Sequence, residues 1–208
     1  MSASGYEGSV FINCPFDDAY HPLFKGLVFA IQDCGHVARC AREVGDASRV
    51  RIDQITQMIA ECKFGVHDLS RTALDEATGL PRFNMPLELG LFLGAKQFGK
   101  GKQARKRALI LDREKYRYRK FCSDIAGQDP KAHGDEVSEA VRAVRNWLSR
   151  TSADRSAAIP SGSIIFERYE SFQEELPAFC HRLNFDANEL IFSDFSTVVE
   201  EWLSVNEW

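Results

Sequence analysis

A single carboxylate in an otherwise uncharged segment is the first candidate for chemistry. Glu88 lies between Leu87 and Leu89, and no other residue from 85 to 94 carries a charge. A carboxylate among apolar neighbours must be paired, be solvated in a cleft or have a raised pKa, and each case makes it a candidate active-site group. The alternative is a surface glutamate near a helix N-terminus, where the helix dipole favours negative charge. Spacing alone does not decide between the two.

Asn84 precedes Glu88 by four residues, so both side chains share one face of a predicted helix over residues 84–98. The amide could orient the carboxylate or bind a hydroxyl group of a ligand. It could equally be the N-cap of this helix, a position that Asn favours.

The elements that must position these residues alternate along the chain. Short apolar runs that end at turn residues predict strands at 9–13, 36–40, 64–68 and 107–112, with a weaker fifth between 124 and 133. Helical periodicity predicts helices at 23–35, 48–62, 84–98 and 135–148. This alternation predicts an α/β fold with a flavodoxin-like, doubly wound, mostly parallel sheet of about five strands.

Two of these helices have predicted inner faces. In the helix at 48–62 the apolar stripe is Val50, Ile52, Ile55, Met58 and Ile59. In the helix at 84–98 we expect Leu87, Leu91 and Phe92 to face the sheet. Gly90 and Gly94, one turn apart, predict close packing of this helix against the sheet.

The chain is expected to have two parts. Residues 1–150 are expected to form the α/β domain. The segment 151–162 is rich in Ser, Ala, Pro and Gly and predicts a linker or surface loop. Helical patterns at 164–183 and 193–203 follow it, so residues 151–208 are expected to form a helical C-terminal extension packed on the core.

Ligands of open parallel sheets bind outside the carboxyl ends of the strands, which turns the predicted strands into a list of site candidates. Beside Glu88, the expected substrate contacts are Asn13, Phe16, Asp17, Arg39, Asp68, Ser70, Arg71 and Asn84. Two further residues at this edge are given other roles. His67 is expected to be a buried structural histidine, and Cys14 has no histidine placed by sequence to activate it as a nucleophile.

Each of these contacts has a functional and a structural interpretation. Phe16 could stack on a planar ring of the ligand, although an aromatic residue at a strand end often belongs to the core. Arg39 and Arg71, with Arg42 as a third candidate, could bind a pyrophosphate through bidentate hydrogen bonds, or be solvated surface charges. Asp68 and Ser70 could hold a ribose or a phosphate, or form a loop turn.

The segment 82–94, Arg-Phe-Asn-Met-Pro-Leu-Glu-Leu-Gly-Leu-Phe-Leu-Gly, carries a resemblance. It resembles the Glu-bearing helix of bacterial TIR-like (Toll/interleukin-1 receptor-like) nucleotide-binding proteins. It is also similar to the corresponding helix of nucleoside 2-deoxyribosyltransferases. The opening strand Val-Phe-Ile-Asn, residues 10–13, resembles the first strand of the same superfamily. The order of elements over residues 8–150 fits this resemblance.

The resemblance implies cleavage of an N-glycosidic bond, with NAD+ as substrate rather than cofactor and with Glu88 matching the catalytic glutamate. A carboxylate near the sugar stabilises the oxocarbenium character that develops as nicotinamide leaves, and this chemistry needs no metal. The product is ADP-ribose, a cyclic isomer or an ADP-ribosyl conjugate, and the implied role is anti-phage defence. Two alternatives remain: a nucleoside deoxyribosyltransferase or hydrolase, and a non-catalytic module that senses a nucleotide or assembles. The Asp-x-Gly-Thr segment that precedes the glutamate in the transferases is absent.

The composition of the chain argues against several classes of protein. The chain has 208 residues and a net charge of −4, from 26 Lys and Arg against 30 Asp and Glu, which argues against a protein that coats nucleic acid. No apolar run reaches the ~20 residues of a membrane span, and the first nine residues lack a signal-peptide core. The six scattered cysteines form no C-x-x-C pair, which predicts free thiols and no zinc site. Together these features predict a cytoplasmic protein.

Two further features could contact a partner. A basic loop before the strand at 107–112 holds Lys100, Lys102, Arg105, Lys106 and Arg107. It is a solvated loop by default, or a contact for nucleotide phosphates or an acidic partner chain. Trp202 and Trp208 could form an oligomer contact. TIR-like enzymes often act when assembled, so the resemblance implies a homo-oligomer and a possible effector or sensor protein as partner.

Overall fold

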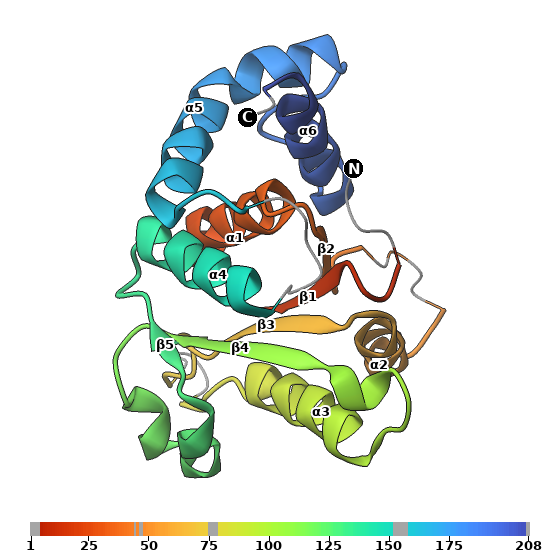
Figure 1. Ribbon diagram of the computed structural model, residues 1–208, viewed down its shortest axis with the longest axis vertical. Coiled ribbons are helices and arrows are strands. Elements are labelled where there is room, and N and C mark those ends of the chain that lie inside the picture. The colour runs from red at the N-terminus through yellow and green to blue at the C-terminus, as the bar shows by residue number, and fades with distance from the viewer. Residues whose placement is uncertain (1–4, 44, 46–47, 75–78, 152–157, 207–208) are drawn as a thin grey trace.

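A parallel sheet of five strands forms the centre of the protein. The computed structural model describes residues 5–43, 45, 48–74, 79–151 and 158–206. The strands are β1 (Ser9–Asn13), β2 (Val37–Cys40), β3 (Phe64–Asp68), β4 (Arg107–Asp112) and β5 (Lys131–Ala132). Their order is β2-β1-β3-β4-β5 and all pairs are parallel, which confirms the predicted flavodoxin-like α/β fold (Figure 1).

Helices cover both faces of the sheet. Helices α1 (His21–Asp33) and α4 (Val137–Thr151) lie on one face, and α2 (Arg51–Glu61) and α3 (Asn84–Phe98) lie on the other (Figure 1). Helices α5 (Gly162–Arg182) and α6 (Phe192–Val205) form an outer layer over α1. Short 3-10 helices span Asp18–Tyr20, Gln103–Arg105, Arg117–Lys120 and Ser123–Gln128. The described residues contain no helix that combines the length and the apolar character needed to cross a membrane.

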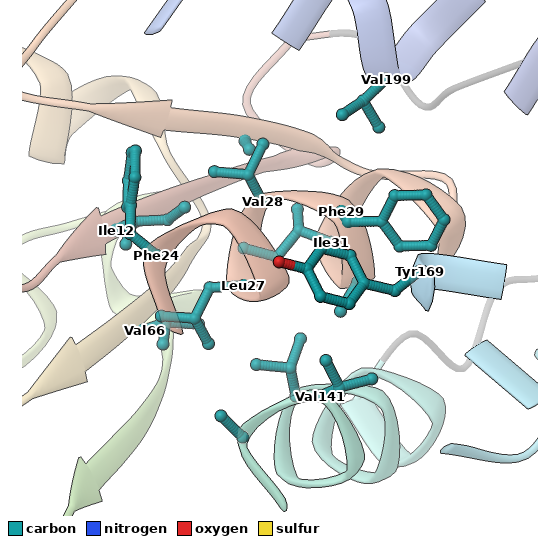
Figure 2. Packing of buried hydrophobic residues seen from close by; sticks show 14 of the residues in the cluster. Ile12, Phe24, Leu27, Val28, Phe29, Ile31, Val66, Val141, Tyr169 and Val199 are labelled. Atoms are coloured by element: carbon teal, nitrogen blue, oxygen red, sulfur yellow. The ribbon is translucent and has the colours of Figure 1, made fainter. Parts of the chain in front are cut away.

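Helix α1 lies at the centre of the main hydrophobic core. Its residues from Leu27 to Ile31 are buried without interruption, which is typical of a helix enclosed on all sides. Figure 2 shows side chains from the sheet, from α1 and from α4, α5 and α6 meeting there, among them Ile12, Val28, Val66, Val141, Tyr169 and Val199. The Phe29 ring contacts the rings of Tyr169, Phe172 and Trp202 at centroid distances of 5.3 to 5.7 Å. The C-terminal helices therefore share one core with the sheet.

The predicted inner faces of α2 and α3 are partly wrong. Val50 precedes the first residue of α2 and is exposed, and Ile52 faces outward, so only Ile55, Met58 and Ile59 of the expected stripe are buried. In α3 the buried residues are Met85, Leu89 and Phe92, whereas Leu87 is 56% exposed. Leu87 and Leu89 are two residues apart and therefore lie on opposite sides of the helix. The side of Leu89, and not the predicted side of Leu87, faces the sheet.

Two other expectations are also corrected. A Cβ at Gly90 would meet nothing within 4 Å, so this position faces open space and does not pack on the sheet. At Gly94 the nearest atom is the far end of Phe98, at 4.0 Å. Trp202 is 3% exposed and its indole N–H donates to Glu175, so it is a core residue and not an oligomer contact. Trp208 and residues 152–157 of the expected linker lie outside the described residues.

Candidate active site

A cleft of about 330 Å³ lies at the carboxyl end of β1, against the first turns of α3. It is lined by residues 13–17, by Arg51 at the start of α2, and by Arg82, Asn84, Met85 and Glu88. The chain leaves β1 for β2 on one side and later returns to β3 on the other, so β1 adjoins the topological switch point of the sheet. This is where open α/β sheets bind ligands. The cleft brings together five of the nine predicted site residues: Asn13, Phe16, Asp17, Asn84 and Glu88.

Glu88 is half-buried in this cleft. Burial raises the pKa of its carboxyl to about 7, and the positive charge of Arg51 offsets part of that rise. The carboxyl has no hydrogen-bond or ion-pair partner among the described residues. Near neutral pH the group is therefore balanced between its two protonation states, as expected for a functional carboxylate in a cleft.

Asn84 lies at the first position of α3, one turn before Glu88, and lines the same cleft. The N-cap position belongs to Phe83, and no side chain caps the helix there. The N-cap interpretation of Asn84 is therefore wrong, because the helix begins one residue earlier than that role requires. The exposed amide stays available beside the carboxylate.

Asn13 connects the sheet to the start of α3. Its side-chain amide donates to the Met85 carbonyl oxygen at 2.8 Å and lies 3.1 Å from Nδ1 of His67. Burial, together with the charge of Lys106, lowers the pKa of His67 to about 3, so the ring is neutral and its Nδ1 can accept. His67 is fully buried, with its ring at the edges of Phe11 and Phe92, as expected for a structural histidine. The result is a fixed start of α3 and a fixed position for Glu88.

An aromatic ring and two charged groups form one rim of the cleft. The Phe16 ring packs against Phe24, and the Arg42 guanidinium lies 4.8 Å from its centroid. Arg42 also donates to the Phe16 carbonyl oxygen at 3.0 Å, which fixes the loop after β1. Asp17 accepts from the backbone N–H of Tyr20 and lies 4.0 Å from Arg82. Phe16 is thus a half-buried ring at the cleft, held in place by Phe24 and Arg42.

Arg51 and Arg82 are cleft residues that the sequence interpretation did not single out. Both are exposed; the charge of Arg51 acts on Glu88, and Arg82 lies 4.0 Å from Asp17. Two exposed guanidinium groups at one cleft form a site for an anion, in particular for phosphate oxygens. The sequence held a signal for Arg51, because the start of a helix that follows a strand lies at the same edge of the sheet as the strand end.

The four other predicted site residues do not reach the cleft. Arg39 forms ion pairs with Glu43 and Glu61 and lies outside it. Ser70 is fully buried, and Arg71 is half-buried with its Nε hydrogen-bonded to no described residue. Asp68 is the last residue of β3 and is fully buried. Contacts between these residues and a ligand in the cleft therefore have no geometric support.

Asp68 belongs to a closed polar network. Its carboxylate accepts the Tyr20 hydroxyl at 2.6 Å and the Ser70 backbone N–H at 2.7 Å, and Nε2 of His133 lies 3.0 Å away. Burial opposes ionisation, but the contacts with His133, Tyr20 and Ser70 outweigh it and hold the pKa of Asp68 below its ordinary value. The network ties the end of β3 to the segment before α1 and to the residue after β5, which is a structural role.

Cys14 lines the cleft but is 3% exposed, and burial raises the pKa of its thiol well above the ordinary value. The thiol is therefore protonated near neutral pH.

The described residues contain no group of three His, Cys, Asp or Glu side chains placed to hold a metal ion.

The basic loop lies at the amino end of β4, the edge of the sheet opposite the cleft. Most of its cations are exposed, but Lys106 is fully buried, which corrects the expectation of a solvated loop at this residue. Its ammonium donates to the carbonyl oxygens of Ile59 and Cys62 at the end of α2 and lies 4.6 Å from the Phe92 ring centroid. Burial lowers the pKa of Lys106 to about 8. This lysine caps a helix C-terminus.

No protein-family model matches the chain, and no curated protein or solved structure matches it either.

Proposed function

We propose that the protein is a TIR-like enzyme that cleaves the N-glycosidic bond of NAD+ at the cleft beside β1. The observation that carries the proposal is the Glu88 carboxyl, which is half-buried and without a protein partner among the described residues, and whose pKa is raised to about 7. A carboxylate of this kind can interact with a positive charge that develops on a substrate.

The chemistry follows from the charge changes. The bond between C1′ of the ribose and the ring nitrogen of nicotinamide breaks, and the electron pair leaves with nicotinamide, which becomes neutral. C1′ gains oxocarbenium character, which ionised Glu88 stabilises. Water then attacks C1′ and loses a proton to give ADP-ribose, or a nucleophile of the same or another molecule gives a cyclic isomer or a conjugate. Because nicotinamide leaves as a neutral molecule, the step needs no general acid.

The arginines of the cleft support a phosphate-bearing substrate. Arg51 and Arg82 both line the cleft, and the two phosphate groups of a diphosphate would contact their guanidinium groups. Phe16, held by Arg42, offers a face on which a nicotinamide or adenine ring can stack. Asn84 can hydrogen-bond a ribose hydroxyl beside the carboxylate.

A nucleoside enzyme is the second candidate, favoured by the size of the cleft. About 330 Å³ is at the lower end of the range for ligand sites and fits one nucleoside better than a whole dinucleotide. On this view Glu88 acts on a free nucleoside, and Arg51 and Arg82 contribute little.

The wider biological setting, which includes anti-phage defence, a cytoplasmic location, a homo-oligomer and an effector or sensor partner, rests on the resemblance of the Glu88 helix alone. A non-catalytic nucleotide-sensing module is the remaining alternative.

The test is product analysis after incubation of the full chain with NAD+ at high protein concentration, in a crowding agent that favours assembly. Release of nicotinamide is expected from the wild type, a loss of at least 100-fold from Glu88→Gln, and wild-type release from Glu174→Gln, an exposed glutamate on α5. Arg51→Ala is expected to raise KM for NAD+ with a smaller effect on kcat.

Three outcomes contradict the proposal. Full activity of Glu88→Gln removes the central assignment. Cleavage of inosine or deoxyinosine, but not of NAD+, supports the nucleoside enzyme. Thermal stabilisation by NAD+ without any release of nicotinamide supports the sensing module.

A further inference from the structure

A second and larger cavity lies away from the Glu88 cleft. It is a groove of about 610 Å³ between α4, the strands β4 and β5, and the segment after β4 that contains Lys115 and Tyr116. None of the described residues that line the cleft beside Glu88 lines this groove. Its volume falls in the middle of the range for small-molecule sites.

The groove follows from a mismatch between a short strand and a long helix. Strand β5 has two residues and pairs only with Leu111 and Asp112 of β4, whereas α4 has fifteen residues. The helix therefore extends past the strand beside the open edge of the sheet (Figure 1). One stripe of α4, which includes Val141 and Val144, is buried in the core. The neighbouring stripe lines the groove at 139, 142–143, 146–147 and 150, over successive turns of the helix.

The charges of the groove favour an anion. Its two acidic residues are already paired: Asp129 contacts Lys131, and Glu139 lies 2.7 Å from Arg142. Lys115 and Arg150 also line the groove, and neither has an acidic partner in the part of the chain that the structure describes. Two cations are thus left for a ligand that carries negative charge.

Two aromatic residues favour a planar group on the same ligand. Trp147 is half-buried in the groove, with its ring at right angles to Phe64 at a centroid distance of 5.7 Å. Tyr116 is 61% exposed, and the Arg119 guanidinium lies 4.6 Å from its ring centroid. Its backbone φ of 63° is a left-handed conformation that is costly for a bulky residue. A strained backbone that holds an exposed ring beside a groove is typical of a ligand contact.

From this combination we infer that the groove binds a nucleotide-like anion, with its planar ring on Trp147 or Tyr116 and its phosphate between Lys115 and Arg150. The ligand class is that of a nucleoside mono- or diphosphate. The inference does not rest on the proposed chemistry of Glu88, because the two cavities share no described lining residue. A ligand bound here would make the groove a second nucleotide site, remote from the glycosidic chemistry.

The test uses ADP, which carries no nicotinamide and so makes the result independent of any cleavage of NAD+. All titrations use the full chain with Arg51→Glu and Arg82→Glu, which removes the cations of the Glu88 cleft. Calorimetry is expected to show binding of ADP in this background. Addition of Lys115→Glu and Arg150→Glu is expected to weaken the affinity at least tenfold. The matched pair Lys96→Glu and Arg182→Glu, exposed cations elsewhere on the surface, is expected to leave it unchanged.

Hydrogen exchange in the same background places the ligand. Protection by ADP is expected in residues 113–118 and 139–151, and Tyr116→Ala is expected to weaken binding at least threefold. The inference is overturned if ADP does not bind, if the Lys115 and Arg150 variants bind as tightly as the background, or if the protected segments lie elsewhere. Equal affinity for inorganic pyrophosphate also overturns it, because such a site would recognise charge without a planar ring.

Discussion

Two carboxylates lie at the carboxyl edge of the same sheet, and their surroundings are opposite. Asp68 is fully buried and contacts Tyr20, Ser70 and His133, which together hold its pKa below the ordinary value. Glu88 is half-buried, has no partner among the described residues, and has its pKa raised to about 7. The protein stabilises one charge with its own groups and leaves the other unstabilised. An unstabilised carboxylate in a cleft is available to a ligand, whereas a fully paired one serves the fold.

The largest expected effect is on stability, when the network of Asp68 with Tyr20, Ser70 and His133 is broken. Asp68→Asn removes the negative charge and one of the two oxygens that contact Tyr20, Ser70 and His133 in a fully buried place, so it is expected to lower the free energy of unfolding by ~3–5 kcal/mol. Urea denaturation at pH 7 measures the loss, with Asp53→Asn, an exposed residue of α2, as control.

The stability lost in Asp68→Asn should depend on pH, because the pKa of Asp68 is lowered in the folded protein. Because folding lowers the pKa of Asp68, its contribution is present above the ordinary value of 3.8 and disappears as the pH falls through the folded value. The gap between the wild type and Asp68→Asn should therefore narrow in acid. A gap that stays constant below this value means that Asp68 is stabilised by packing and not by its charge.

A smaller loss of stability is expected when Asn13, which connects the sheet to the start of α3, is replaced. Asn13→Ala removes the hydrogen bond to the Met85 carbonyl oxygen and the contact with His67, which should cost ~1–3 kcal/mol. The start of α3 should loosen at the same time, and cleavage of NAD+ should fall more than tenfold through kcat. Thermal denaturation and initial rates measure the two effects. Full activity at normal stability means that Asn13 does not position Glu88.

The smallest expected effect is a gain in stability, from replacement of Glu88. The ordinary pKa of glutamate is 4.5 and that of folded Glu88 is about 7, so between these values only the folded chain holds the proton. Stability should then fall as the pH rises from 4.5 to 7. Glu88→Gln avoids this loss and should be more stable than the wild type by ~1–2 kcal/mol at pH 8, after allowance for the partial exposure of the group.

Melting temperatures of the two chains from pH 4 to pH 8 measure this difference. At pH 4 the two chains should melt together, because the carboxyl is neutral in both the folded and the unfolded wild type. At pH 8 the variant should melt ~2–4 °C higher for each kcal/mol gained. Equal melting at both values means that the Glu88 carboxylate is well solvated, and the contrast with Asp68 then disappears.

Local patterns were sufficient to predict the sheet and the helix that carries Glu88. The strands β1, β3 and β4 are short apolar runs that end at Asn13, Asp68 and Asp112, and the periodicity around Glu88 placed Asn84 on the same face. The paired site could not be predicted, because the hydroxyl that Asp68 binds is 48 residues away in the sequence. Arg51 was missed because the helical pattern was taken to begin at residue 48, which placed this arginine inside the helix and away from its exposed start.

Helix α1 has a consequence for the order in which the chain folds during synthesis. Its inner side meets the sheet, but its outer side is covered by α5 and α6, and Phe29 packs on Tyr169, Phe172 and Trp202. The ribosome releases residues 21–33 long before residues 162–206, so the outer side of α1 stays uncovered until α5 and α6 emerge. During that interval the nascent chain exposes aromatic surface to other proteins. The main hydrophobic core is therefore completed only after α5 and α6 have been synthesised.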